Sequence, residues 1–210
     1  MAADPSFWNN LAEKYAKQPV ELPQAFERKI GITSNLMKPT DTLLEVGCGT
    51  GSLALRLAPF AAHIHALDLS NEMVRIARGK VSSQGFGNIA FHVGAFDESF
   101  STFADGSFDG VCAYSILHLV DDRDEALARM FRLLKPGGFF VSSTACRGES
   151  WIPYGPVITV MRWLGKAPMV KIFSKADCAE SVRAARFVDV ESPDVGAQPE
   201  CAFLVARRPN

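Results

Sequence analysis

The sequence has few cysteines for its length and no C-x-x-C pair. Five cysteines are scattered through 210 residues. This spacing argues against a structural zinc site and against a disulfide-rich secreted fold. It favours a reduced, intracellular protein. The five are Cys48, Cys112, Cys146, Cys178 and Cys201.

An excess of charge and long apolar runs are also lacking. The formal net charge is -1, which gives no general attraction to a phosphate backbone, so nucleic acid is not an expected partner. The most apolar late segment, 151–174, is interrupted by prolines and basic residues, which argues against a transmembrane segment. The amino terminus has no basic stretch followed by an apolar run, so we expect no signal peptide and predict a cytoplasmic localisation.

What the chain does contain is enough apolar side chain for one folded domain. Hydrophobic residues make up 48% of the sequence and charged residues 21%, which suits a single domain with a substantial core. No internal repeat or low-complexity tract interrupts the pattern. Residues 1–210 are therefore expected to form one domain.

The stretch around which the chain is organised is L-L-E-V-G-C-G-T-G-S-L-A-L-R-L, residues 43–57. Its apolar start is typical of a strand buried on both faces. Gly47, Gly49 and Gly51 follow at every second position, and helical spacing comes next. Glycine permits a tight, partly left-handed turn that lets a ligand lie against bare backbone, and unpaired amides at the helix start are expected to face that ligand. The pattern predicts a nucleotide-type cradle.

An acid ends the next predicted strand, 64–68. Asp68 lies about twenty residues after Gly47, where a carboxylate reaches ribose hydroxyls in nucleotide-binding folds. Its two oxygens can accept both hydroxyl protons. The alternative is a helix cap, although Ser70-Asn71 already offers one. We favour ribose binding.

Strands and helices alternate along the rest of the chain. The last two strands are joined by a link too short for a helical crossover, so this pair is expected to be antiparallel. Further strands are predicted at 89–93, 108–115, 139–145, 187–191 and 201–206, and helices at 4–15, 22–37, 71–83, 121–134 and 175–185.

The motifs resemble those of the class I S-adenosylmethionine-dependent methyltransferases. The first motif of that family has the form E/D-x-G-x-G-x-G, which Glu45 to Gly51 match, whereas a dinucleotide fingerprint would have Gly or Ala where this chain has Ser52. L-L-K-P-G-G at 133–138 is a second match. The resemblance covers roughly residues 40–206. It implies an α/β fold, a single Rossmann-like, doubly wound, mostly parallel seven-stranded sheet with a C-terminal antiparallel hairpin, and S-adenosyl-L-methionine as the cofactor.

The resemblance also implies which residues hold this cofactor. The glycines would accommodate its methionine part with Glu45 near the ammonium group, and Met73 would pack on the adenine edge or else fill the core. One departure stands out: the family's Gly-Asp-Ala after the third strand is Gly94-Ala95-Phe96 here, so the adenine-contacting acid is missing unless Asp97 replaces it. The expected cofactor-binding residues are Glu45, Gly47, Cys48, Gly49, Gly51, Asp68, Leu69, Met73, Ala95, Phe96, Tyr114 and Ser115.

Methyl transfer from a sulfonium needs alignment and exclusion of water, so neither a catalytic triad nor a metal is expected. His118, after the fourth strand, is the candidate base, and loop packing is its alternative role. Tyr15 is the second catalytic candidate and belongs to an N-terminal helical cover, residues 1–38. Its alternative role is a buried helix face.

The aromatic segment 147–175 is expected to form an acceptor pocket or lid, with a long helix packed on the sheet as the alternative. A pocket lined by Trp151, Tyr154, Met161, Trp163 and Phe173 favours a small, fairly apolar methyl acceptor.

The acceptor's identity stays open, and the chain is expected to be a monomer or homodimer. Two other functions are left open, an NAD(P)-binding oxidoreductase and a non-catalytic protein with a methyltransferase-like fold.

Overall fold

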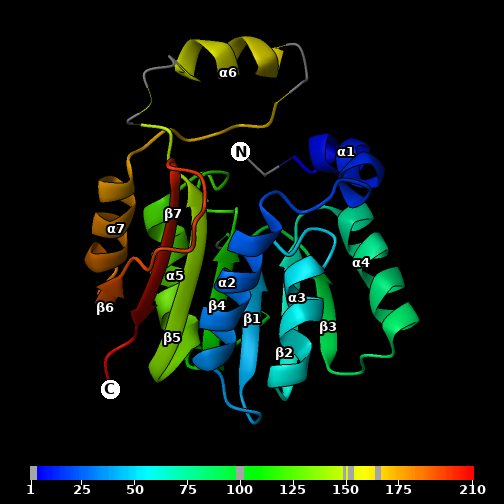
Figure 1. The fold of residues 1–210 in the computed structure, drawn as a ribbon, viewed down its shortest axis with the longest axis vertical. Helices are drawn as coiled ribbons and strands as arrows, with labels where there is room; N and C mark the ends of the chain where they lie inside the picture. Colours follow the sequence, from blue (N-terminus) through cyan, green and yellow to red (C-terminus); the bar gives the residue numbers. More distant parts are fainter. Residues whose placement is uncertain (1–3, 98–101, 149, 151–153, 164–166) are drawn as a thin grey trace.

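A computed structural model describes residues 4–97, 102–148, 150, 154–163 and 167–210. Seven strands form one sheet in the order β3-β2-β1-β4-β5-β7-β6 (Figure 1). β7 is antiparallel to β5 and β6, and the other neighbouring pairs are parallel, so the predicted sheet with its reversed final pair is confirmed. The strands are β1 (Thr42–Val46), β2 (His63–Asp68), β3 (Ile89–Val93), β4 (Phe108–Tyr114), β5 (Leu134–Ala145), β6 (Val188–Glu191) and β7 (Cys201–Arg207).

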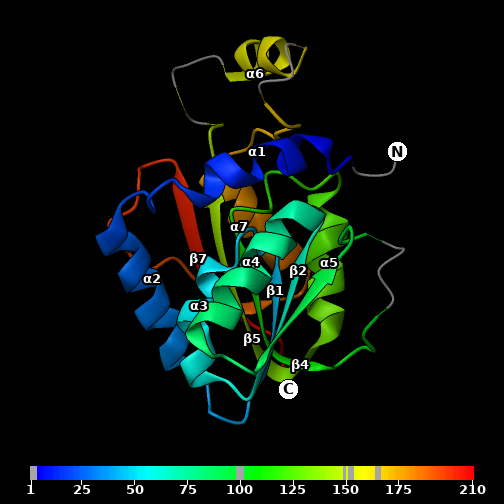
Figure 2. The ribbon, with the colours of Figure 1, turned by 90° about the vertical axis from the view of Figure 1, so that its right-hand side faces the viewer.

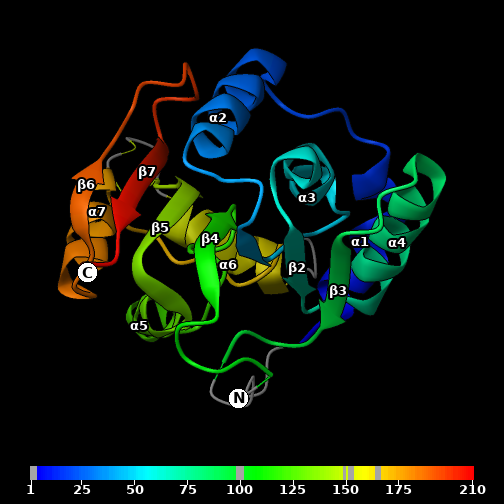
Figure 3. The ribbon, with the colours of Figure 1, turned by 90° about the horizontal axis from the view of Figure 1, so that it is seen from below.

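Helices cover both faces of this sheet. Figure 3 shows α2 and α3 on one face and α5 and α7 on the other. Successive side chains of a buried strand point to opposite faces, so Leu43 packs in the cluster that includes α2 and α3, and Leu44 packs in the one that includes α5 and α7. The helices are α1 (Ser6–Ala16), α2 (Pro23–Asn35), α3 (Ser52–Leu57), α4 (Asn71–Gln84), α5 (Arg123–Leu133), α6 (Tyr154–Trp163) and α7 (Lys175–Ala184), with a 3-10 turn η1 (Ala58–Phe60).

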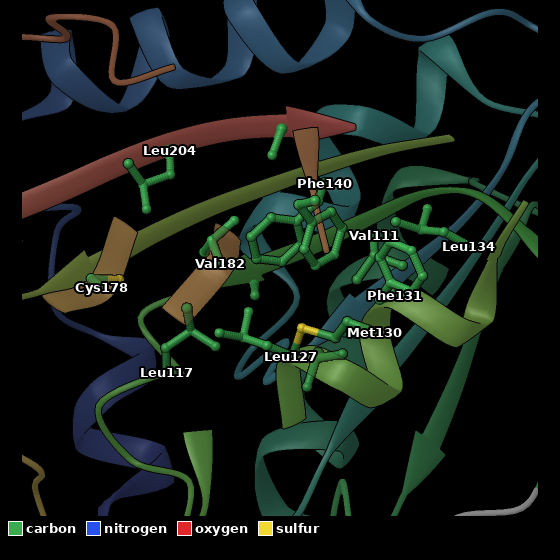
Figure 4. Packing of buried hydrophobic residues seen from close by; sticks show 14 of the residues in the cluster. Val111, Leu117, Leu127, Met130, Phe131, Leu134, Phe140, Cys178, Val182 and Leu204 are labelled. Atoms are coloured by element: carbon green, nitrogen blue, oxygen red, sulfur yellow. The ribbon is translucent and has the colours of Figure 1, made fainter. Parts of the chain in front are cut away.

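The larger hydrophobic cluster lies between the sheet, α5 and α7 (Figure 4). Phe140 of β5 and Val111 of β4 are completely buried there, together with Leu127 and Met130 of α5 and Val182 of α7. Packing of this kind gives the strands fixed positions. The loops at the strand ends are therefore held on a rigid platform.

Two helices lie beyond the carboxyl ends of the parallel strands. Figures 1 and 2 show α1 lying across this end of the molecule, with α6 farther from the sheet. The side chain of Asn9 in α1 accepts a hydrogen bond from the Ser70 hydroxyl at 2.6 Å, which ties α1 to the start of α4. Of the segment predicted as an N-terminal cover, α1 lies over the end of the sheet where nucleotide-binding folds bind their ligands, whereas α2 lies on a face of the sheet.

Several strand ends differ from the sequence prediction, most by one residue and the start of β5 by five. β5 begins at Leu134, not at Phe139, because Leu134 already pairs with Phe108 of β4. The left-handed Gly137, at a φ of +74°, lies in an irregularity between Leu134 and Phe139. A register shift between Phe108 and Gly110 accommodates it. β4 ends at Tyr114, one residue early, because Ser115 has a φ of 56°.

Candidate functional site

A cavity of about 1180 Å³ opens at the carboxyl ends of the parallel strands. Its walls come from α1, α2, the loop after β1, the ends of β2, β4 and β5, and the segment before β7. All the predicted cofactor residues except Gly51 line it. The sequence argument therefore brought together residues from four separate strand ends.

The glycine loop shapes one wall of the cavity. Gly47 and Gly51 have φ angles of +74° and +77°, and a Cβ built on them would lie 2.8 Å from Ile116 and 2.9 Å from Ala77. Both positions need glycine for conformation and for space. At Gly49, also left-handed at +52°, the nearest atom to such a Cβ would be in the Tyr15 ring at 3.8 Å.

Several amides of this loop are already bonded within the protein. The N–H groups of Gly47 and Cys48 donate to the Leu67 carbonyl at 2.8 and 2.9 Å, and that of Gly51 donates to the Cys48 carbonyl at 2.9 Å. The predicted ligand-facing amides are those at the start of α3, after Gly51, and these three bonds do not test them. The three bonds fix the loop against β2, and the ligand-facing surface there is bare backbone.

Glu45 contributes a buried carboxyl group with one unpaired oxygen. Its side chain is buried, at 4% exposure, and its Oε2 has no hydrogen-bond partner in the part of the chain that the structure describes. Burial, and then the nearby Asp68, raise the pKa of Glu45 to about 8. A backbone hydrogen bond from Ala54 lowers this pKa and so opposes part of the shift. A cationic group bound beside it would satisfy the unpaired oxygen, as the ammonium of the expected cofactor would.

Asp68 stands at the end of β2, facing the same cavity. Its Oδ2 accepts the Gly49 N–H at 2.8 Å and its Oδ1 accepts the Ser70 N–H at 2.9 Å. Burial raises its pKa, and these two hydrogen bonds oppose that shift. The N-cap of α4 is Ser70, whose hydroxyl accepts the Met73 N–H at 3.1 Å. Each Asp68 oxygen keeps a further lone pair, so ribose binding stays a prediction for it.

The residues predicted to contact adenine form the β2–β3 side of the cavity. Leu69, Ala95, Phe96 and Met73 all line it, and Met73 is only 2% exposed. The face of Phe96 lies 5.9 Å from the Arg129 guanidinium. Ala95 and Phe96 border the cavity, and reading of the adenine edge by their main chain stays a prediction.

At the end of β4, the two predicted residues differ in what they offer. The Tyr114 hydroxyl is hydrogen-bonded to Thr33 Oγ1 at 2.8 Å and donates to the Lys29 carbonyl at 3.4 Å, so it points to α2. Burial raises the pKa of Tyr114 further. Its ring borders the cavity while its hydroxyl is engaged. Ser115 is exposed and donates its N–H to the Ser143 carbonyl at 2.6 Å.

The two catalytic candidates, His118 and Tyr15, both border the cavity. Burial, and then Arg147, lower the pKa of His118 to about 4, so its ring is neutral near pH 7. The buried His118 Nδ1 has no partner among the described residues. Tyr15, at the end of α1, is 43% exposed. Partial burial, and then the nearby Asp68, raise its pKa.

The aromatic segment 147–175 contributes less to the cavity than its composition predicts. Tyr154 lines it, with the Arg147 guanidinium 4.7 Å from its ring centre. Phe173 is instead buried in the core beside Arg123, and Trp163 is 86% exposed. The pocket prediction is therefore wrong for Phe173 and Trp163. Met161 is exposed and is not among the lining residues, and Trp151 lies outside the described residues.

Lys29, Ser143 and Cys201 are among the cavity residues that sequence reasoning missed. Each lies in a predicted helix or strand with no motif around it, so no local signal marks it. Among the described residues, no group of three or more His, Cys, Asp or Glu side chains could hold a metal ion. No helix in this part of the chain is long and apolar enough to cross a membrane.

Comparison with known proteins gives a consistent picture. Residues 44–142 match the methyltransferase domain family. A ubiquinone/menaquinone biosynthesis C-methyltransferase UbiE from Geotalea daltonii is 35% identical over 116 residues, which cover 53% of this chain and 48% of that protein. The chain thus matches about half the length of this relative.

Solved structures of low identity share the fold. The YcgJ protein from Bacillus subtilis has a TM-score of 0.72 at 17% identity, covering 88% of this chain and 99% of that one. The phosphoethanolamine N-methyltransferase 2 of Haemonchus contortus, solved with phosphomonomethylethanolamine and S-adenosylhomocysteine, has a TM-score of 0.73 at 18% identity. It covers 88% of this chain and 53% of that one.

Proposed function

Because the chain belongs to the class I S-adenosylmethionine-dependent methyltransferases, we propose that it transfers the methyl group of S-adenosylmethionine to a small, fairly apolar acceptor by direct displacement. The observation that carries this proposal is the buried Glu45 carboxylate, which has an unpaired oxygen beside the glycine loop. The oxidoreductase alternative has no support from the family match. Its dinucleotide-binding pattern also requires Gly or Ala at position 52, where this chain has Ser52.

When bound, S-adenosylmethionine supplies a methyl group that its sulfonium has already activated. Glu45 accepts hydrogen bonds from the ammonium group, and the glycine loop leaves room for the methionine part. Asp68 accepts the ribose hydroxyl protons through the lone pairs that Gly49 and Ser70 do not use. The β2–β3 wall holds the adenine.

The chain's other task is to align the acceptor and exclude water, which gives most of the rate enhancement in a displacement of this kind. Tyr15 of α1 and Tyr154 of α6 border the cavity on its outer side. His118 is neutral and can accept a proton from an acceptor that binds protonated. Tyr114 and Ser115 flank the reacting centre from the sheet side.

The relative's name supports a quinone-type ring as the acceptor. UbiE of Geotalea daltonii is named as a C-methyltransferase of ubiquinone and menaquinone biosynthesis. A ring of that type is largely apolar, and the cavity has room for a ring beside a nucleoside. A monomer or homodimer acting in the cytoplasm, without nucleic acid, completes the proposal.

Calorimetric titration with S-adenosylhomocysteine tests this function. We expect binding well below millimolar, and a loss of at least tenfold in affinity in Asp68→Ala. NADH, titrated in parallel, is expected to give no heat. A protein that binds neither ligand would be non-catalytic, and the proposal would then fail.

A further inference from the structure

Three side chains from distant parts of the chain meet in the cavity, away from the glycine loop. Lys29 Nζ of α2 donates a hydrogen bond to Ser143 Oγ of β5 at 2.8 Å and lies 3.7 Å from Cys201 Sγ of β7. Ser143 Oγ and Cys201 Sγ are 3.4 Å apart. All three residues line the cavity. We call this group the Lys29 cluster.

The register of the sheet explains why they meet. Ser143 pairs with Tyr114 on one side and with Phe203 on the other, and Cys201 lies two residues from Phe203 along β7. Residues two apart on a strand share a face, so Ser143 and Cys201 both point towards α2. The Lys29 main chain is held there too, since its carbonyl accepts hydrogen bonds from Tyr114 and Thr33.

Among the described residues, none forms an ion pair with the Lys29 ammonium. Its two side-chain partners are a hydroxyl and a thiol. Glu200 also lines the cavity but makes no ion pair with it. A half-buried ammonium with only neutral partners is stabilised by a bound anion.

Lys29 and the two carboxyl groups of the predicted cofactor site lie at different parts of the cavity. The carboxylates of Glu45 and Asp68 lie at the β1–β2 end, and the Lys29 ammonium lies at β5 and β7. β1 and β5 are separated by β4, which places the two ends roughly 10 Å apart. The acidic end suits the ammonium of the methyl donor, and the cationic end lies beyond it.

We propose that the Lys29 cluster is the acceptor subsite and binds an acceptor through an ionised ring oxygen, a phenolate or enolate of quinone-type chemistry. This inference rests on the proposed methyl transfer and specifies its substrate class. The Lys29 ammonium and the Ser143 hydroxyl donate to the oxygen, which keeps the acceptor in its anionic form. Cys201 packs against the edge of the same subsite.

The step balances without a co-reactant. An electron pair of the acceptor anion forms the bond to the methyl carbon, while the carbon–sulfur bond breaks and leaves its pair on sulfur. The negative charge of the acceptor and the positive charge of the sulfonium are lost together. If the attacking atom is a ring carbon, its proton then leaves to water. Lys29 keeps all its protons throughout.

The test uses two probes that differ in one charge. Lawsone is a naphthoquinone whose ring hydroxyl is ionised at neutral pH, and its methyl ether is neutral. Each is titrated calorimetrically into the full chain saturated with S-adenosylhomocysteine. The variants are Lys29→Met and, as a matched control, Lys38→Met, because Lys38 is exposed and does not line the cavity. Ser143→Ala serves as a second variant should Lys29→Met fail to fold.

We expect Lys29→Met to weaken lawsone binding at least tenfold and to leave the methyl ether within about twofold. Ser143→Ala should weaken lawsone about threefold, and Lys38→Met should change neither probe. Equal lawsone binding by wild type and Lys29→Met, a preference of wild type for the methyl ether, or no lawsone binding at all would overturn the inference. Loss of S-adenosylhomocysteine binding by the wild type would instead count against the proposed function.

Discussion

The carboxylate of Asp68 accepts the backbone N–H of Gly49 at 2.8 Å, a bond that joins the end of β2 to the glycine loop after β1. Its second oxygen accepts the N–H of Ser70 at the start of α4. The Asp68 side chain thus holds the glycine loop, holds the N-cap residue of α4 and borders the cavity. The residue predicted to hold the ribose also builds the wall against which the nucleoside would lie.

Asp68→Asn should therefore weaken the fold and the ligand site together. The amide offers one accepting oxygen in place of two, so one of the two backbone bonds is lost, at a cost of about 1.5–3 kcal/mol for a bond to a charged group. S-adenosylhomocysteine binding should fall at least tenfold by calorimetry. Asp109→Asn is the matched control, because Asp109 also makes two bonds, to the Thr42 N–H and to Lys135, at the opposite end of the sheet. It should lower the unfolding temperature but leave binding unchanged, and equal binding losses in both variants would contradict a direct role for Asp68.

Gly51→Ala should destabilise the loop for two reasons. A side chain at a φ of +77° is strained, and its Cβ would lie 2.9 Å from that of Ala77 in α4. The two effects together should cost about 2–4 kcal/mol, measured by urea unfolding. Gly79→Ala is the control, since Gly79 lies within α4 and a Cβ added there would meet nothing within 4 Å. That substitution should stabilise the protein by about 1 kcal/mol, and a stable Gly51→Ala would mean that the loop adopts another conformation.

The parts of the site that sequence alone predicted are those encoded locally. Gly47 and Gly51 mark the loop because their backbone conformations exclude other residues, and Asp68 marks the end of β2 because an acid closes an apolar run. Both signals lie within a few residues of the feature they predict. The reversed final pair was likewise predictable, since the link before Cys201 is too short for a crossover.

The parts that sequence missed depend on register between distant strands. Lys29 and Ser143 meet only because β5 pairs with β4 in one particular register, and no pattern near either residue encodes that. The Tyr114 hydroxyl turns to Thr33 because α2 packs against this part of the sheet, which no local pattern encodes either. Phe173 was assigned to the pocket by composition, yet the contact with Arg123 and the core shows that an aromatic segment does not reveal which of its rings face a ligand.

Binding of S-adenosylhomocysteine should release a proton from Glu45. The pKa of Glu45 is raised to about 8, so most of this carboxyl is protonated at pH 7 in the free protein. A bound ammonium favours the ionised form and lowers that pKa. Calorimetry at pH 7 in phosphate and in Tris should therefore give different heats, which correspond to the release of up to about one proton. Glu45→Gln should abolish the difference, and identical heats in the two buffers for the wild type would contradict the prediction.

The same group makes stability depend on pH. Because the folded pKa of about 8 lies above the ordinary value of 4.5, the wild type is most stable below pH 4.5 with respect to this group and loses stability as the pH rises to 8. The loss is about 1.4 kcal/mol for each unit of pKa shift. Glu45→Gln should not show this loss. Urea unfolding should therefore find that the free energy of unfolding of the variant, relative to that of the wild type, is higher at pH 8 than at pH 5. If the difference in free energy of unfolding between the wild type and Glu45→Gln did not change with pH, Glu45 would be ionised in the free protein.

His118 should matter only for acceptors that bind with their hydroxyl proton in place. Its pKa of about 4 lies below the ordinary 6.5, so folding is favoured by this group above pH 6.5 and the benefit is lost as the pH falls from 6.5 to 4. A neutral ring can accept a proton at every pH above about 5. For a reduced hydroquinone, which binds protonated, His118→Gln should lower kcat about a hundredfold. For a hydroxyquinone that binds already ionised beside Lys29, the loss should stay below about threefold, because no proton has to be removed before the methyl group moves. Equal losses for the two acceptors, measured with labelled methyl donor, would assign His118 to packing of the loop after β4.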